Sequence, residues 1–207
     1  MTAQTFLFNQ DMKADNFSRD AIQKERIIPL VTIEKIDEVD KIFRALESSG
    51  LCCAEITFRT QCAAEAIAYA VKYFPKIRIG AGTVLNAAQC ESALDAGAKF
   101  IISPGLSASV ADICRMRDVS YYPGCVTPTE IMQALALGLT VVKFFPADIY
   151  GGVKAVKALS APFPQIKFIP TGGVTWQNAD EYLRCDKIYA VGGSFFTKDA
   201  LQKMASL

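Results

Sequence analysis

Short apolar runs recur along the chain and alternate with segments that have apolar residues at helical spacing. Eight of these runs are rich in β-branched and aromatic residues, which is typical of strands buried on both faces of a parallel sheet. We expect strands at residues 27–32, 52–56, 77–80, 100–103, 121–124, 141–145, 166–170 and 188–191.

Several of the intervening segments carry helix-capping signals. Thr127-Pro128-Thr129-Glu130 combines a capping box with proline at the first helical position. Gly50, Gly97 and Gly138 stand where left-handed helix C-caps belong. We expect helices at residues 36–49, 63–73, 87–96, 109–117, 130–137, 153–159 and 176–183, a short final helix at 198–205, and a capping helix at 16–25.

The alternation predicts an α/β fold, a (β/α)8 TIM barrel, because strands return about every 20 to 26 residues. A doubly wound open sheet is the alternative, but the first strand is not followed by the glycine-rich nucleotide fingerprint of that fold. No linker, low-complexity tract or charge run divides the chain. We therefore expect a single domain over residues 1–207, of which 1–26 form an N-terminal segment and capping helix.

Charge and hydropathy exclude several classes of partner. The net charge of +1 gives no electrostatic footprint for nucleic acid and no basic cluster for a membrane surface. No apolar run reaches the roughly 18 residues needed to cross a bilayer, and the N-terminus lacks the pattern of a signal peptide. We expect a cytoplasmic protein that binds neither nucleic acid nor membrane.

The chain contains seven cysteines and no histidine. An odd number of cysteines without a C-x-x-C pair argues against a disulfide framework, and most of them should be small buried hydrophobes. The absence of histidine excludes imidazole metal sites and triads that use Ser-His or Cys-His. Acid–base chemistry must use carboxylates, lysines or tyrosines, and we expect no metal or cofactor.

Lys143 interrupts the apolar run 141–145. Burying an unpaired ammonium costs several kcal/mol, and the usual relief is a lowered pKa that leaves a neutral amine. Such an amine is suited to forming a Schiff base with a ketone. The alternative is a lysine that reaches solvent from the strand end or sits in a structural ion pair, and the strand alone does not separate the two.

Glu55 is a lone opposite charge on the second apolar strand, 52–56. Glu55 and Lys143 both fall near the carboxyl ends of their strands, where barrels place active sites. A purely structural Glu–Lys pair would stabilise the fold only weakly. The position favours a proton-transfer carboxylate beside an amine nucleophile, with its pKa raised by burial.

Further polar groups follow other strands. Arg59 offers a planar fork that suits a carboxylate, and Thr83 offers a hydroxyl beside Gly82, which leaves the backbone open. Thr171-Gly172-Gly173 and Gly192-Gly193-Ser194 follow strands seven and eight. Loops at these positions often bind phosphate through backbone N–H groups, so we expect a phosphate there, although a single Gly-Gly pair would only indicate a tight turn.

Together these motifs resemble the 2-keto-3-deoxy-6-phosphogluconate (KDPG) aldolase family, which includes 4-hydroxy-2-oxoglutarate (KHG) aldolase activity. The resemblance runs in order from about Ile28 to Phe196. It rests on Glu55-Ile-Thr-Phe-Arg-Thr60, Gly80-Ala-Gly-Thr-Val-Leu-Asn86, Ile102-Ser-Pro-Gly105, Val142-Lys-Phe-Phe-Pro-Ala147, Pro170-Thr-Gly-Gly173 and Gly192-Gly-Ser194.

The resemblance implies a class I aldolase, typically a homotrimer, that splits KDPG reversibly into pyruvate and glyceraldehyde 3-phosphate. It implies Lys143 as the Schiff-base lysine and Glu55 as the proton-transfer carboxylate. The first strand lacks an arginine that some relatives carry near its end, so no substrate contact is inferred from it. The implied substrate-binding residues are Arg59 and Thr83 for the pyruvate carboxylate, Pro104, Thr171 near the substrate hydroxyls, and Gly172, Gly173, Gly193 and Ser194 for the phosphate.

Three other functions remain open from the sequence. KHG cleavage into pyruvate and glyoxylate could be the main activity. An isomerase or epimerase on a phosphate-binding barrel would use two carboxylates or a metal, whereas Lys143 is paired with the single carboxylate Glu55. A catalytically silent barrel that only binds sugar phosphates is the third.

Overall fold

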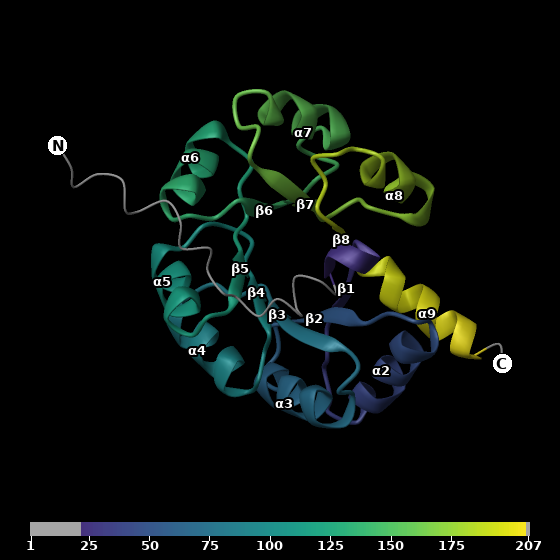
Figure 1. Ribbon diagram of the computed structural model, residues 1–207. Helices are drawn as coiled ribbons and strands as arrows, with labels where there is room; N and C mark the ends of the chain where they lie inside the picture. Colours follow the sequence, from purple (N-terminus) through teal and green to yellow (C-terminus); the bar gives the residue numbers. More distant parts are fainter. Residues whose placement is uncertain (1–21, 206–207) are drawn as a thin grey trace.

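The computed structural model describes residues 22–205, which form a ring of helices around a central set of parallel strands (Figure 1). The strands are β1 (Ile27–Val31), β2 (Cys53–Thr57), β3 (Arg78–Gly82), β4 (Phe100–Ile102), β5 (Ser120–Tyr122), β6 (Val141–Phe144), β7 (Lys167–Pro170) and β8 (Val191–Gly193). The helices are α2 (Glu38–Ser48), α3 (Ala63–Tyr73), α4 (Ala87–Asp95), α5 (Ala108–Met116), α6 (Pro128–Ala136), α7 (Gly152–Ser160), α8 (Trp176–Leu183) and α9 (Phe195–Ala205).

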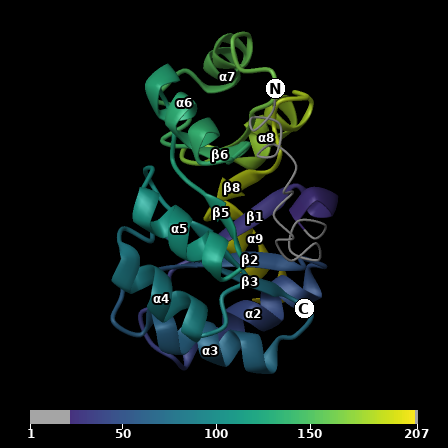
Figure 2. The ribbon, with the colours of Figure 1, turned by 60° about the vertical axis from the view of Figure 1, so that its left-hand side comes forward.

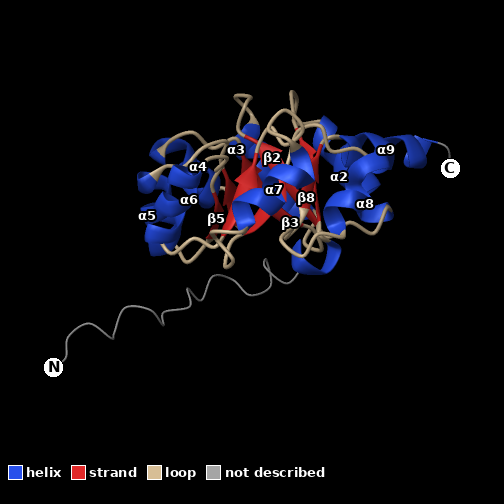
Figure 3. Cartoon of the chain, turned by 90° about the horizontal axis from the view of Figure 1, so that it is seen from above, coloured by secondary structure: helices blue, strands red, loops and turns tan. Residues whose placement is uncertain are grey.

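The strands close into a barrel. Six of them form one parallel sheet in the order β5-β4-β3-β2-β1-β8, and β6 pairs with β7. Parallel bridges complete the ring, because Gly124 joins Lys143 on β6, and Thr171 joins Gly192 on β8. Figure 2 shows the strands from the side, and Figure 3 shows them enclosed by helices. The predicted (β/α)8 barrel is confirmed.

Local signals set most of the helix boundaries. Thr127 and Glu130 form the predicted capping box at the start of α6. The left-handed conformations expected at Gly50, Gly97 and Gly138 are present, with φ of 75°, 98° and 77°. Of the capping helix expected at 16–25, residues 22–25 are helical and the rest lies outside the described residues.

The prediction for the eighth strand was wrong by several residues. Ile188 makes only an isolated bridge to β7, and the chain pairs with β1 from Val191 onward. Gly192 and Gly193 are therefore strand residues rather than a turn. The final helix begins at Phe195, three residues before its predicted start at position 198, and packs against α2 and β1.

The barrel interior changes from apolar to polar along the strands. A buried apolar cluster that includes Phe100, Ile102 and Ile169 fills it, together with Cys53 on β2 and the partly buried Val141 on β6. Side chains two residues apart on a strand face the same side, so Glu55 and Lys143 follow Cys53 and Val141 inward, one step nearer the carboxyl ends. A larger apolar cluster packs between strands and helices. In the described part of the chain, no helix has both the length and the apolar character needed to cross a membrane.

Candidate active site

Lys143 is held at the centre of the site by backbone hydrogen bonds to the segment that follows β5. Its N–H donates to the carbonyl of Pro123 at 2.7 Å, and its carbonyl accepts from the N–H of Cys125 at 2.9 Å. The residue is only 3% exposed. Its Nζ lies 5.0 Å from the centroid of the Phe145 ring. Lys143 is therefore buried, and the alternative of a lysine that reaches solvent from the strand end is wrong.

Glu55 approaches the barrel axis from the opposite wall, because β2 and β6 stand four strands apart in the ring of eight. The residue is 1% exposed. Burial raises the pKa of its carboxyl, and the charges of Lys143 and then Arg59 oppose that rise. Its Oε1 has no hydrogen-bond partner among the described residues. A buried carboxyl with a raised pKa and an unused oxygen is suited to both giving and accepting a proton.

Gly82 makes room for this carboxyl. It is the last residue of β3 and pairs in register with Thr57 on β2. A Cβ at position 82 would lie 2.7 Å from both Cδ and Oε1 of Glu55, and 3.1 Å from Oε2. Sequence reasoning treated Gly82 only as the neighbour of Thr83, since no local pattern shows that a carboxyl from another strand rests against it.

Arg59 and Thr83 meet directly, as expected of two groups that would share one ligand. Arg59 Nε donates to Thr83 Oγ1 at 3.1 Å, and the N–H of Phe58 donates to the carbonyl of Gly82 at 2.7 Å. Thr83 has a φ of 55°, a costly conformation for a β-branched residue and one often found at functional sites. The bond to Thr83 uses Nε, so it leaves the two terminal nitrogens of the Arg59 fork to other partners.

The turn after β7 has the predicted glycine geometry. Gly172 and Gly173 are left-handed, with φ of 88° and 75°, and α8 begins shortly after them. The loop after β6 supports this turn, because the N–H of Ala147 donates to the carbonyl of Thr171 at 2.9 Å and that of Asp148 to the carbonyl of Gly172 at 3.2 Å. Thr171 is 3% exposed and thus lies inside the barrel mouth.

Asp148 is a charged neighbour of this turn that sequence reasoning missed. Its carboxyl group occupies the space that a side chain on Gly173 would need. Its Oδ1 accepts the N–H of Ile149 at 2.8 Å. A carboxylate at this place opposes the binding of a nearby dianion, so the glycine turn is less favourable to phosphate than its backbone alone suggests.

The glycines at the end of β8 belong to the strand itself rather than to a turn after it. A Cβ on Gly192 would lie 2.5 Å from Thr171 Oγ1, and one on Gly193 would lie 2.5 Å from the Phe195 ring. Gly192 therefore permits close packing against Thr171, and Gly193 permits close packing against the ring of Phe195 at the start of α9. Ser194 is exposed and its carbonyl accepts from Lys198 N–H at 3.2 Å, at the start of α9.

Pro104 lies beside Gly124, in the segment that follows β5 and pairs with Lys143. Its carbonyl packs so closely on Gly124 that a side chain at position 124 would collide with it, and Gly124 bridges to Lys143. The structure thus gathers the predicted residues from β2, β3, β6, β7, β8 and the loop after β4 at one end of the barrel. Within residues 22–205, no group of three His, Cys, Asp or Glu side chains could hold a metal ion.

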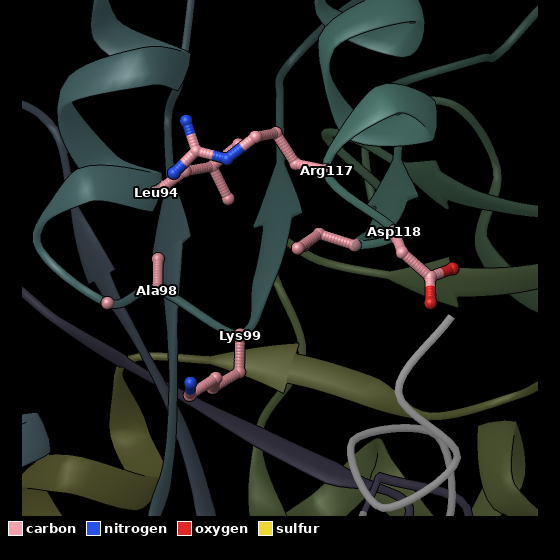
Figure 4. A pocket seen from close by; sticks show the side chains of 7 residues that line it. Leu94, Ala98, Lys99, Arg117 and Asp118 are labelled. Atoms are coloured by element: carbon pink, nitrogen blue, oxygen red, sulfur yellow. The ribbon is translucent and has the colours of Figure 1, made fainter. Parts of the chain in front are cut away.

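A surface pocket lies elsewhere. It is lined by residues that precede β4 and β5, including Ala98, Lys99 and Asp118 (Figure 4). These positions are at the amino-terminal end of the barrel, which in this fold contributes to stability rather than to catalysis. The pocket is therefore separate from the site around Lys143.

Comparison with known proteins gives consistent matches over nearly the whole chain. A family model described as KDPG and KHG aldolase matches residues 19–206. The 2-dehydro-3-deoxy-phosphogluconate aldolase of Treponema pallidum (strain Nichols) is 42% identical over 176 residues, which are 85% of this chain and 84% of that relative.

Two solved structures are similar in fold and sequence. The KDPG aldolase of Legionella pneumophila, with pyruvate captured at low pH as a covalent carbinolamine intermediate, has a TM-score of 0.84 and 34% identity, over 90% of this chain and 91% of that one. The KDPG aldolase of Zymomonas mobilis ZM4 with 3-phosphoglycerate has a TM-score of 0.82 and 37% identity, over 91% of this chain and 94% of that one.

Proposed function

Because the chain belongs to the KDPG and KHG aldolase family, we propose that it is a class I aldolase that splits KDPG reversibly into pyruvate and glyceraldehyde 3-phosphate. One observation carries the proposal. A buried amine, Lys143, and a buried carboxyl, Glu55, approach the barrel axis from opposite walls at the end where the barrel opens to substrate. This pair can perform imine chemistry without a Lewis acid.

In the proposed reaction, the amine of Lys143 attacks the C2 carbonyl of the substrate and forms a carbinolamine. Glu55 protonates the leaving hydroxyl, so that water departs and an iminium ion remains. The ionised carboxylate then removes the proton of the C4 hydroxyl, the C3–C4 bond breaks and its electrons move into the iminium. The aldehyde leaves, the enamine is protonated at C3, and water releases pyruvate. One carboxyl can make these transfers in turn if its pKa lies near the working pH, which agrees with the raised pKa of Glu55.

The other residues bind the substrate in this proposal. Arg59 and Thr83, already joined by a hydrogen bond, hold the pyruvate carboxylate. Pro104 borders the pyruvate end, and Thr171 lies near the substrate hydroxyls. The phosphate is held by backbone N–H groups and one hydroxyl near the starts of α8 and α9, from Gly172, Gly173, Gly193 and Ser194.

The direct test is pyruvate release from KDPG by the purified protein, followed by coupling to lactate dehydrogenase and NADH. We expect turnover that is lost in Lys143→Met, a substitution of similar length that keeps the apolar stem and lacks the amine. Turnover by Lys143→Met at the parent rate would refute the proposed mechanism. If the parent turns over neither KDPG nor KHG, the aldolase assignment is refuted.

KHG cleavage is a second candidate, favoured by one observation. The Asp148 carboxylate beside Gly173 disfavours a phosphate dianion, and KHG carries no phosphate. Kinetics with KDPG and KHG side by side decide between them. A higher kcat/KM for KHG identifies it as the main substrate, whereas a higher value for KDPG shows that the glycine turn overcomes the carboxylate.

We also propose that the chain is one domain over residues 1–207 and acts in the cytoplasm as a homotrimer. The family resemblance and the absence of a nucleic-acid footprint in the sequence support this. Size-exclusion chromatography with light scattering gives the test, and a mass of one chain or two would contradict the trimer.

A further inference from the structure

Two thiols outside the active site lie in contact. Cys90 on α4 and Cys114 on α5 have their sulfur atoms 3.7 Å apart, and they are 0% and 1% exposed. All seven cysteines fall within residues 22–205 and are free, and no other two of them share a hydrogen bond in this part of the chain. The helices that carry the two cysteines pack together, and a disulfide would bring the sulfurs to about 2.05 Å.

A second set of contacts fixes the two helices at the same place. Arg117, just beyond the end of α5, donates to Glu91 on α4 at 3.1 Å and to Asp95 at 2.9 Å. Figure 4 shows the Arg117 side chain extending toward Leu94. Glu91 is the immediate neighbour of Cys90, and Arg117 lies one turn beyond Cys114. These ion pairs join α4 to the end of α5 on the surface beside the two thiols.

We propose that Cys90 and Cys114 form an oxidation site, which hydrogen peroxide converts into a disulfide between α4 and α5. One thiolate attacks a peroxide oxygen, the O–O bond breaks, and a sulfenic acid and water form. The second sulfur attacks the sulfenic sulfur, the S–O bond breaks, and a second water leaves. Each sulfur loses one electron and the peroxide gains two, so two thiols and one peroxide give one disulfide and two waters.

The hydrogen bond between the two sulfurs shifts the pKa values of their thiols in opposite directions. The hydrogen bond with Cys114 lowers the pKa of the Cys90 thiol, against the effect of burial. The same hydrogen bond, together with burial, raises the pKa of Cys114. Because the thiolate is the reactive form, the sulfur that ionises attacks the peroxide and the other resolves the sulfenic acid.

The disulfide would close a loop of about 25 residues, which lowers the conformational entropy of the unfolded chain and so stabilises the folded state. For a protein of this size the expected rise in Tm is about 6–12 °C. The pair belongs to the apolar cluster between strands and helices rather than to the barrel interior. Imine formation at Lys143 should therefore be unchanged, and the inference stands independently of the proposed function.

The test uses the full chain, treated with hydrogen peroxide, unfolded and alkylated. We expect two of the seven thiols to be lost, peptides containing Cys90 and Cys114 to be linked, and Tm to rise until dithiothreitol reverses it. Cys90→Ala and Cys114→Ala should form no intramolecular disulfide and show no rise. Cys185→Ala, which removes another buried thiol, should behave as the parent.

Met116 and Met132 report whether the peroxide has acted, because they are 75% and 61% exposed. The proposal is overturned if both methionines are oxidised while Cys90 and Cys114 stay reduced. It is also overturned if the linked peptides contain other cysteines, or if the cross-linked protein has a Tm at or below that of the reduced form.

Discussion

Gly82→Ala should disable catalysis by displacing Glu55. The added Cβ would lie 2.7 Å from Cδ and Oε1 of the carboxyl, whereas nonbonded carbon atoms prefer about 3.5–4.0 Å. Among the described residues, Gly82 is not one of the glycines with a positive φ, so alanine can adopt its backbone conformation. The perturbation is therefore the steric clash between the new Cβ and the Glu55 carboxyl. The carboxyl must move by about 1 Å, and misplacement of that size costs about 10²-fold in rate.

We therefore expect kcat/KM for KDPG to fall about 10²-fold in Gly82→Ala, measured by coupled pyruvate release. Overpacking should also lower the free energy of unfolding by about 1–3 kcal/mol, measured by urea titration. Gly105→Ala is the matched control, because a Cβ there meets nothing within 4 Å, and it should stay within a few-fold of the parent. A folded Gly82→Ala enzyme with parental kcat/KM would refute the reasoning that this contact positions the catalytic carboxyl.

Four further predictions follow from the same site. Glu55→Gln should lower kcat by about 10²–10⁴-fold while pyruvate still binds, and a kcat within a few-fold of the parent would assign the proton transfers to another group. Burial raises the pKa of Glu55 above 4.5, so ionising this carboxyl destabilises the folded state, and its contribution to stability is lost as pH rises through the folded-state pKa. The Tm of Glu55→Gln should therefore increase relative to the Tm of the parent as pH rises from about 4.5. A Tm difference that does not change with pH would contradict this. Gly173→Val should raise KM for KDPG and spare imine formation with pyruvate, because valine is strained at a φ of 75° and would distort the turn proposed to hold the phosphate; equal loss of both would show that the turn supports the fold. Turnover should survive a chelator, since an iminium ion withdraws electrons as a Lewis acid would, and restoration by a divalent ion after loss would contradict it.

The barrel could be predicted from sequence because its strands are buried on both faces and form continuous apolar runs. Capping residues such as Thr127 and Glu130 marked helix starts for local chemical reasons. The eighth strand was misplaced because its limits depend on pairing of Val191 with Ile27, more than 160 positions away in the chain. An apolar run shows that a strand exists but does not show where its pairing begins.

The same distinction applies to the site. Lys143 and Glu55 could be singled out because a lone charge in an apolar strand is costly and needs a reason. The space that Gly82 leaves for Glu55 and the carboxyl of Asp148 beside Gly173 could not be predicted. Each joins residues from different strands or loops, and no local spacing encodes those contacts.

The central claim is that Lys143 forms a Schiff base with pyruvate. The test is to incubate the protein with pyruvate and borohydride and to analyse its digest by mass spectrometry. Borohydride reduces the imine to a stable secondary amine, which marks the lysine that formed it. We expect one reduced pyruvate adduct per chain, on the peptide that contains Lys143, and none in Lys143→Met. An adduct on another lysine, equal labelling of Lys143→Met, or no adduct on a protein that cleaves KDPG would contradict it.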